Sequence, residues 1–404
     1  MLAPRHLQIV QATVPVLQTH GEAISAWFYR DLFDAHPELF NVFNPVNQRD
    51  GSQARSLAAA ILSYAAAIDQ PERLAAMVER IANKHGSLEV LPEHYPIVGE
   101  HLLRAIRSVL GDAASDDVLE AWGAAYGVLA EIMIGREAEL YAGRWRGFKP
   151  FRVARRVEES ETIASFHLVP EDGELVAHRP GQYVSVNVHV PGAPYAQIRQ
   201  YSLSCAPNGR EYRISVKREA APAGVPVAGG LVSNYLHEHV RTGDTLLVHA
   251  PLGDFVLDEE SSRPIVLLSG GAGITPVMGM LEQLAATRSS RAIVFVHAAT
   301  QRSHHAFRDA VREIVSGLER ARAVVFYERV SAEERRGEDY DETGLIDAAR
   351  LRGYLPAEAD IYTSGPPAFV DAMAGILDTL GVPRARRHDE SFAPDPEAIT
   401  ASAA

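Results

Sequence analysis

The chain has 404 residues, 39 of them basic and 52 acidic, which gives a formal net charge of −13, and 47% of its positions are hydrophobic. This hydrophobic content excludes a mainly disordered chain, and the length predicts two or three domains of roughly 150 residues each. An acidic protein repels phosphate, so no nucleic acid is expected as a partner. The single cysteine, Cys205, excludes internal disulfides and sites with several thiolate ligands, so any redox chemistry needs an acquired cofactor.

The sequence also predicts no transmembrane segment. The amino terminus lacks the basic region, continuous apolar run and small-residue cleavage site of a secretory signal. Two uncharged stretches, 220–237 and 264–281, are about as long as the shortest membrane spans, but several glycines and prolines interrupt both. We expect loops joining short elements there, and a cytoplasmic monomer.

Residues 1–140 have the apolar spacing of helices. One stripe runs from Leu7 through Val10 and Val14 to Leu17, and a second contains Leu74, Met77, Val78 and Ile81. This part is predicted to be all helix. Proline and glycine punctuation predicts breaks at Pro37, at 44–45, at 69–71, at Gly86, at 91–92 and at 111–112.

A change in composition at 141–150 predicts a linker. Two glycines and a proline interrupt the pattern, and six basic residues without an acid lie between Arg144 and Arg156. A solvated linker is favoured over contact with acidic lipid or with a cofactor phosphate.

Apolar residues alternate with polar ones after the linker. Val184, Val186 and Val188 form one alternating run, and Tyr212–Val216 forms another, so both are predicted to be half-buried strands. Turn residues at 179–181, 207–209 and 242–244 separate such runs. The segment 151–260 is therefore predicted to be a small antiparallel β-barrel.

Short apolar runs and helical stretches alternate from 264 to 394. The runs are at 265–268, 293–296, 324–327 and 361–362, and helices are expected after Pro276, around 307–318 and after Pro366. Strand and helix in succession predict an α/β domain with a parallel sheet. The residues 395–404 are expected to be a frayed tail.

A glycine-rich motif, SGGAGITP at 269–276, lies between a predicted strand and a predicted helix. Gly271 and Gly273 permit close approach of a pyrophosphate, Thr275 is predicted to cap the helix, and Pro276 suits its first turn. The acid expected about 20 positions later, which binds a ribose hydroxyl in many dinucleotide sites, is absent. Arg302 stands there instead, either as a partner for a ribose phosphate or as a surface arginine.

The predicted barrel contains a second set of candidates. Arg199, Tyr201 and Ser202 share a strand, and they offer a phosphate donor, a ring for a flat heteroaromatic group and a hydroxyl. Ser233 follows two glycines and is predicted to cap a short helix, whose amino end is a second anion site. Each of these residues alone is more often ordinary sheet or helix surface.

These motifs, in this order, resemble the ferredoxin-reductase family of flavoproteins over about 151–394. The resemblance implies that FAD is held by Tyr183, Arg199, Gln200, Tyr201 and Ser202, and Ser233 at the helix amino end is a further cofactor-binding candidate. It implies that the nicotinamide pyrophosphate is held by Gly271, Ala272, Gly273, Ile274, Thr275 and Pro276, and that Glu390 and Phe392 lie near the flavin. The family often has a cysteine before a Gly-Pro pair, where this chain has Ser364.

The helical segment has its own constellation. His85 continues the apolar stripe that ends at Ile81, and a lone histidine on such a face is more often a satisfied core residue than a ligand. The stretches around it resemble a globin and, with the reductase segments, the flavohaemoglobin family. They are FYRDLF (28–33), PELFNVFN (37–44), NQRDGSQ (47–53), KHGS (84–87), EHYPIVGEHLL (93–103) and AWGAAYGVLAEIMIGREAELY (121–141).

This resemblance assigns roles in a haem pocket. His85 is the implied proximal iron ligand, with Tyr95 and Glu137 on its side making the imidazole more electron-donating. Tyr29 and Gln53 are the implied distal hydrogen-bond donors. Phe43 and Leu57 are the implied pocket-lining residues. Lys84 and Glu390 are candidates for tuning the haem and flavin potentials, although an exposed charge without function is an equal explanation for Lys84.

The expected protein is multidomain, with an all-α globin, an antiparallel β-barrel for FAD and an α/β parallel-sheet domain for NAD(P). The resemblance implies haem b, FAD, and NADH or NADPH as cofactors, and dioxygen and nitric oxide as substrates. Electrons would pass from NAD(P)H to FAD to haem, and haem-bound dioxygen would oxidise nitric oxide to nitrate. A haem oxygen carrier or sensor, and a flavin reductase with a non-catalytic globin-like domain, are the alternatives.

Overall fold

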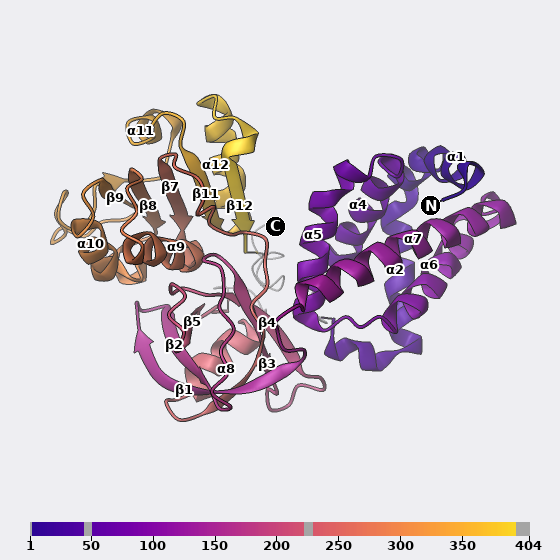
Figure 1. The fold of residues 1–404 in the computed structure, drawn as a ribbon, viewed down its shortest axis with the longest axis horizontal. Coiled ribbons are helices and arrows are strands. Elements are labelled where there is room, and N and C mark those ends of the chain that lie inside the picture. The colour runs from indigo at the N-terminus through magenta and orange to yellow at the C-terminus, as the bar shows by residue number, and fades with distance from the viewer. Residues whose placement is uncertain (1, 44–50, 222–228, 393–404) are drawn as a thin grey trace. The chain divides into compact units, whose positions relative to one another are not determined.

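The computed structural model describes residues 2–43, 51–221 and 229–392. The chain divides into two compact units (Figure 1). The first contains the chain up to Gly147 together with Asn187–Ile198. The second contains Phe148–Val186 and the described residues from Arg199 onward.

The amino-terminal domain is helical, as its apolar spacing predicts. Its elements are α1 (Pro4–Ala12), α2 (Val14–Ala35), η1 (Pro37–Asn41), α4 (Ser52–Ala66), α5 (Pro71–Leu88), α6 (His94–Leu110), η2 (Gly111–Ala113) and α7 (Asp116–Leu140). Proline occupies the first turn of several of them, because an N–H is not needed there. The core is built from side chains such as Val10, Leu32, Ala105 and Ala121, which are completely buried.

One detail of the helical prediction is wrong. No break occurs at Gly86: α5 continues to Leu88, because one glycine costs a helix only about 1 kcal/mol and Tyr141 Oη donates a hydrogen bond of 2.8 Å to the Gly86 carbonyl. The stripe Leu7–Leu17 spans two helices, because Pro15 lacks the N–H that a continuous helix would use. The predicted break at 44–45 lies outside the described residues.

One helix among the described residues, α7, is long and apolar enough to cross a membrane. Length and composition are weak evidence, since a core helix of a water-soluble domain has the same properties. Here α7 buries Trp122, Met133 and Glu137 against its own domain.

The second segment forms the predicted antiparallel barrel. Its strands are β1 (Phe148–Glu158), β2 (Ile163–Pro170), β3 (Tyr183–Val188), β4 (Gln197–Ser202), β5 (Tyr212–Lys217) and β6 (Thr245–His249), in the order β4-β3-β6-β1-β2-β5. A bridge between Leu203 and Ile214 joins the chain just after β4 to β5 and closes the sheet. A short helix, α8 (Leu231–His239), lies between β5 and β6 in the chain.

Each of the two strands predicted to be half-buried has one buried serine on its polar face, whose other residues are partly exposed. Ser185 in β3 and Ser215 in β5 are as buried as the valines beside them. Ser215 Oγ lies 2.8 Å from Ser165 Oγ and 2.7 Å from Ser204 Oγ, so a local hydroxyl cluster satisfies it. Alternation indicated both strands correctly but not the burial of these two serines.

The carboxy-terminal domain is the predicted α/β fold. Its strands are β7 (Ile265–Gly270), β8 (Ile293–Ala299), β9 (Ala321–Tyr327), β10 (Glu342–Thr343), β11 (Asp360–Gly365) and β12 (Arg387–Ser391), all parallel, in the order β10-β9-β8-β7-β11-β12. Its helices are α9 (Ile274–Ala286), α10 (Arg308–Ser316), α11 (Ala348–Arg352) and α12 (Pro367–Thr379).

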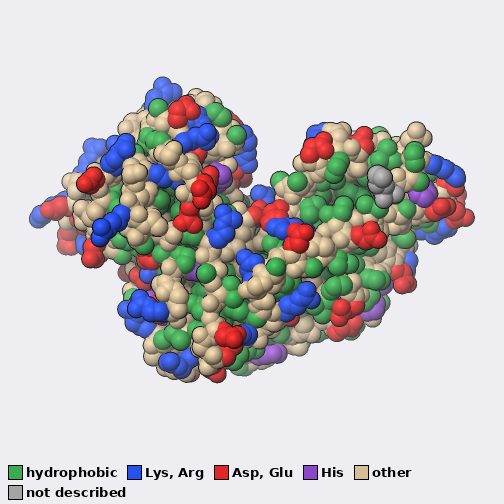
Figure 2. All heavy atoms as spheres, in the orientation of Figure 1, with side chains coloured by type: hydrophobic (Ala, Val, Ile, Leu, Met, Phe, Trp, Pro, Cys, Tyr) green, Lys and Arg blue, Asp and Glu red, His purple; other side chains and the backbone are tan. Residues whose placement is uncertain are grey.

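The helices cover both faces of this sheet (Figure 1). One apolar cluster joins α9 and α10 to the sheet, and another joins α11 and α12 to its opposite face. Figure 2 shows basic and acidic side chains interspersed over this domain on the face drawn, rather than gathered by sign. Because the strands are parallel, one edge of the sheet contains the carboxyl ends of β7, β8, β11 and β12. Dinucleotides bind at this edge in folds of this class.

Candidate active site

The side chain of His85 in α5 meets two side chains from two other helices. Its Nδ1 lies 3.0 Å from Tyr95 Oη of α6 and 3.1 Å from Glu137 Oε1 of α7. Tyr95 Oη in turn donates a hydrogen bond of 2.5 Å to the same carboxylate oxygen. The residues lie 10 and 52 positions from His85 in sequence, and the packing of α5 and α6 against α7 brings them together.

This triad orients the imidazole for ligation through Nε2. Because Tyr95 uses its proton on Glu137, the remaining carboxylate lone pairs accept from Nδ1–H and keep Nε2 as the basic nitrogen. Burial, followed by the hydrogen bond to Glu137, raises the pKa of Tyr95, so the phenol stays protonated. Among the described residues no group hydrogen-bonds to Nε2, and the His85 side chain is 33% exposed while Glu137 is 5% exposed. A haem iron fits this donor.

Two further tyrosines support the triad and were not predicted from the sequence. Tyr126 Oη donates to the Tyr95 carbonyl at 2.7 Å, and Tyr141 Oη donates to the Gly86 carbonyl, next to His85. Both lie on the face of α7 that carries Glu137, since spacings of 11 and 4 residues return to one side of a helix. That spacing is visible in the sequence.

The predicted distal residues also come together. Gln53, in the first turn of α4, hydrogen-bonds to the hydroxyl of Tyr29, which is buried in α2. Burial raises the pKa of Tyr29, and the hydrogen bond with Gln53 opposes that rise only in part. The phenol of Tyr29 therefore stays protonated.

Apolar side chains surround this pair. The Tyr29 ring stacks on Phe33 and meets Phe43 edge-on, with ring centroids 5.9 and 6.2 Å apart. Leu57 and Phe43 are partly buried against the core of the domain. The surface around Tyr29 is therefore apolar and aromatic, as a flat macrocycle requires. Lys84, by contrast, is exposed on α5.

The proposed flavin residues lie on neighbouring strands of the barrel. Arg199, Gln200, Tyr201 and Ser202 are consecutive in β4, and Tyr183 begins β3 beside it. Tyr183 exchanges two backbone hydrogen bonds of 2.9 Å with Leu252, and a Cβ on Gly253 would lie 3.0 Å from its ring. The absence of that Cβ lets the phenol ring lie against the backbone at Gly253.

The prediction that Ser233 caps α8 is wrong. The helix begins at Leu231 with Gly230 as its N-cap, and Ser233 lies in the first turn. Ser233 Oγ donates to the Gly230 carbonyl at 3.2 Å and accepts from the Glu219 N–H at 3.3 Å. The helix amino end still presents backbone N–H groups, but Ser233 shapes the turn rather than capping it.

The glycine motif follows β7 as predicted, but its helix begins one residue before Thr275. Gly271–Gly273 form a 3₁₀ turn, Gly273 is the N-cap of α9, and Thr275 Oγ1 donates back to the Ala272 carbonyl at 3.0 Å. Gly271 has a φ of +53°, and nothing lies within 4 Å of where its Cβ would be. Open space in front of this turn fits a pyrophosphate.

Glu390 and Phe392 lie at the same edge of the sheet. Glu390 of β12 is in register with Ser364 of β11, which is in register with Ser269 of β7, and Phe392 N–H donates to Gly365 O at 2.9 Å. Ser364 is completely buried, and in the described part of the chain its hydroxyl has no hydrogen-bond partner.

A buried histidine pair at this edge was not predicted. His297 Nδ1 lies 2.9 Å from Ser269 Oγ, His305 Nδ1 lies 2.9 Å from Tyr327 Oη, and the two imidazole centroids are 4.6 Å apart. Burial lowers the pKa of His297 to about 3 and also lowers that of His305. The pair is neutral at ordinary pH and connects the glycine turn to β8 and β9.

Two family models match the chain: Globin over residues 26–133 and Oxidoreductase NAD-binding domain over 267–375. The Flavohemoprotein of Deinococcus radiodurans is 54% identical over 402 residues, which cover 98% of each chain. The chain belongs to the flavohemoprotein family. The Flavohemoprotein of Halalkalibacterium halodurans, 47% identical over 96% of each chain, is another relative of this kind.

Solved structures agree with this membership. The flavohemoglobin of Malassezia yamatoensis with bound FAD and heme matches with a TM-score of 0.85 and 27% identity, over 97% of this chain and all of that one. The FAD/NAD-binding domain of nitric oxide dioxygenase from Vibrio cholerae matches 62% of this chain and all of that domain, with a TM-score of 0.55 and 38% identity. This flavohemoprotein therefore uses haem, FAD and NAD(P)H, and it is an NAD(P)H-dependent oxidoreductase.

Proposed function

We propose that this flavohemoprotein is a nitric oxide dioxygenase. The net reaction consumes two molecules of nitric oxide and two of dioxygen for each NAD(P)H, giving two nitrate ions, NAD(P)⁺ and a proton. One electron is needed for each nitrate, and the hydride provides two. The observation that carries the proposal is the triad of His85, Tyr95 and Glu137, in a chain that also contains a reductase.

When bound, haem supplies an iron centre for dioxygen, and FAD accepts a hydride and releases its two electrons singly. Glu137 increases the electron density on His85 through the Nδ1 hydrogen bond, which favours activation of dioxygen over its storage. Tyr95 holds the carboxylate in place and stays protonated because of its raised pKa. Lys84 and Glu390 are the residues we propose to adjust the two potentials.

On the distal side, the Tyr29 hydroxyl lies next to the Gln53 amide, and it would donate a hydrogen bond to dioxygen in the pocket as negative charge develops there. Phe43 and Leu57 exclude water, which strengthens this hydrogen bond by lowering the local dielectric. The aromatic contacts among Tyr29, Phe33 and Phe43 keep the phenol in one orientation.

Within the second unit, the barrel and the α/β domain are held in contact next to both proposed nucleotide sites. Gly279 of α9 lies so close to the segment after β4 that a Cβ there would be 2.8 Å from the Leu203 carbonyl. Arg213 of β5 pairs with Glu282 of α9 at 2.8 Å. These contacts fix the strand Arg199–Ser202 against the helix that follows the glycine turn, as hydride transfer between two bound groups requires.

Aerobic removal of nitric oxide, followed with an electrode on protein of known haem and FAD content, tests the proposal. Wild-type protein is expected to consume nitric oxide only with NAD(P)H, and Tyr29→Phe is expected to slow turnover about ten- to hundredfold, as the loss of a hydrogen bond to a charged acceptor predicts. Tyr64→Phe is the matched control, since the Tyr64 hydroxyl donates to the Ala125 carbonyl.

Unchanged turnover in Tyr29→Phe would remove Tyr29 from the mechanism. Reduction of the flavin by NAD(P)H without consumption of nitric oxide would leave a reductase or an oxygen carrier. Loss of the haem absorption band in His85→Ala is expected, and its persistence would overturn the assignment of the ligand.

A further inference from the structure

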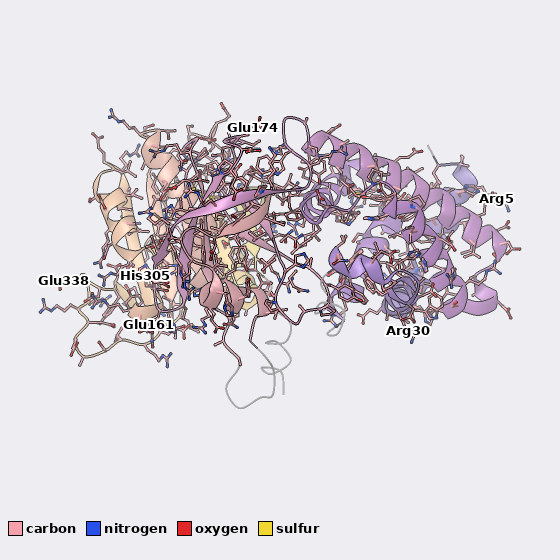
Figure 3. All side chains as sticks on the ribbon, turned by 90° about the horizontal axis from the view of Figure 1, so that it is seen from below. Arg5, Arg30, Glu161, Glu174, His305 and Glu338 are labelled. Carbon is pink, nitrogen blue, oxygen red and sulfur yellow. The ribbon has the colours of Figure 1, made fainter. Side chains whose placement is uncertain are left out.

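A hollow of about 560 Å³ opens at the carboxyl end of β8, where the barrel meets the α/β domain. Arg302, Ser303, His305 and Arg308 line it from the segment after β8. The turn after β1 contributes Glu158–Ser160, and Glu161 N–H donates to the Ser303 carbonyl at 2.9 Å. Figure 3 shows His305 and Glu161 at this end of the molecule.

The place of the hollow in the sheet suggests what occupies it. The glycine turn follows β7, and β8 is its parallel neighbour. In dinucleotide-binding α/β sheets the adenosine ribose lies at the end of this second strand, where an acid binds the 2′-hydroxyl of NAD or an arginine accommodates the 2′-phosphate of NADP. The sequence here is Thr300-Gln301-Arg302-Ser303, so Arg302 alone would indicate NADPH.

The structure changes that interpretation because Arg302 already pairs with a carboxylate. Its Nη1 lies 3.5 Å from Asp339 Oδ1, and Nη1 of Arg308 lies 3.3 Å from the same oxygen. Asp339 Oδ2 accepts the Arg335 N–H at 3.0 Å, and the Asp339 side chain is only 14% exposed. The Arg335 N–H, with the nearby arginines, keeps the pKa of Asp339 low, so the carboxylate is charged.

The remaining lining of the hollow is acidic. Glu158, Glu159, Asp309 and Glu334 outnumber its two arginines, and Asp309 also pairs with Arg308 at 2.9 Å. A phosphate monoester carries about −1.5 to −2 charges at neutral pH. Its entry would require displacement of Asp339 and would place it among carboxylates, whereas a ribose hydroxyl can hydrogen-bond to either.

We propose that Asp339, by pairing with Arg302 and Arg308 at the end of β8, makes this site select NADH over NADPH. Asp339 is a specificity-determining residue that acts through the two arginines. The inference rests on nicotinamide binding by this flavohemoprotein and is independent of the reaction with nitric oxide.

Two measurements on the full-length holoenzyme test it. Anaerobic stopped-flow reduction of the flavin gives a second-order rate constant for NADH and for NADPH, and calorimetry gives the Kd of 5′-AMP and of adenosine 2′,5′-bisphosphate. Asp339→Asn removes the negative charge that pairs with Arg302 and Arg308, and it is expected to shift the rate ratio toward NADPH by up to about fivefold, the effect of one partly exposed ion pair. The ratio of the two Kd values is expected to shift in the same direction.

Asp339→Glu keeps the charge and is expected to retain the preference for NADH. Asp347→Asn is the matched control, because Asp347 also pairs with an arginine, and that arginine, Arg350, does not line the hollow. A wild-type preference for NADPH, or equal shifts in Asp339→Asn and Asp347→Asn, would overturn the proposal. Flavin reduction by NADH without removal of nitric oxide would contradict the proposed function and leave this inference intact.

Discussion

At the scale of single residues, the role of a titratable side chain depends on the hydrogen-bond partners that stabilise one of its protonation states. His85 has an apolar helix face as its sequence context, which by itself suggests a core histidine. Its partners, Tyr95 and Glu137, lie on other helices, and only packing brings them within 3.0 and 3.1 Å of Nδ1. The role of the imidazole therefore depends on a contact between residues that are 52 positions apart.

Replacement of Glu137 by glutamine is expected to weaken electron donation by His85. The amide cannot carry the negative charge that polarises Nδ1–H, so the iron–histidine stretching frequency in resonance Raman spectra should fall. Nitric oxide consumption should decrease about tenfold, as the loss of a partner of a metal ligand predicts. Glu139→Gln is the control, since Glu139 is exposed on the same helix and pairs with Arg136. Identical frequencies in both variants would contradict a special role for Glu137.

At the scale of elements, both helices at the nucleotide sites begin at glycine rather than at a hydroxyl side chain. Ser233 and Thr275 follow the cap instead of forming it, because Gly230 and Gly273 occupy positions where a Cβ would collide with neighbouring atoms. Sequence preferences for capping favour Ser and Thr, and they do not include such tertiary collisions.

β12, with the sequence RHDES, lacks an apolar pattern because it is an edge strand, which explains why it was not predicted.

Gly273→Ala is expected to destabilise the second unit by about 1–3 kcal/mol, the cost of overpacking. The added Cβ would lie 1.9 Å from the Ser364 carbonyl oxygen, so β11 and the glycine turn must separate. Thermal unfolding followed by FAD fluorescence measures the loss, and the KM for NADH should increase.

Gly375→Ala is the control for this change. Gly375 lies in α12 with nothing within 4 Å of its Cβ position, so alanine should stabilise the helix by up to about 1 kcal/mol. Equal melting temperatures for the two variants would show that the close approach at Gly273 has no energetic weight.

At the scale of the whole molecule, the second unit keeps many histidines neutral. Burial lowers the pKa of five of them: His178, His237, His297, His305 and His388. In the unfolded chain these groups take up protons near pH 6.5, whereas the folded unit resists protonation until lower pH. Between the folded-state and unfolded-state pKa values, the unfolded chain binds more protons than the folded unit. The contribution of these histidines to the free energy of unfolding is therefore complete above about pH 6.5 and is lost as the pH falls.

The second unit is therefore expected to melt at a lower temperature at pH 5.5 than at pH 7.5, as followed by FAD fluorescence. His297→Gln removes a group whose pKa is about 3 in the folded unit, and it should reduce the drop between the two pH values. The exposed His239 provides the control, and His239→Gln should leave the drop unchanged. An equal drop in wild type and both variants would show that the carboxylates, not these histidines, set the acid sensitivity.

The sequence by itself determined the division into a helical domain, an antiparallel barrel and a parallel α/β domain, because apolar periodicity reports local structure directly. It also indicated Tyr29, Gln53, His85, Tyr95 and Glu137 through their resemblance to a known family. Only the tertiary structure decided which of these side chains touch, where the helices at the nucleotide sites begin, and that Asp339 occupies the arginines at the end of β8. Such properties depend on contacts between distant parts of the chain, and periodicity and local motifs carry no information about them.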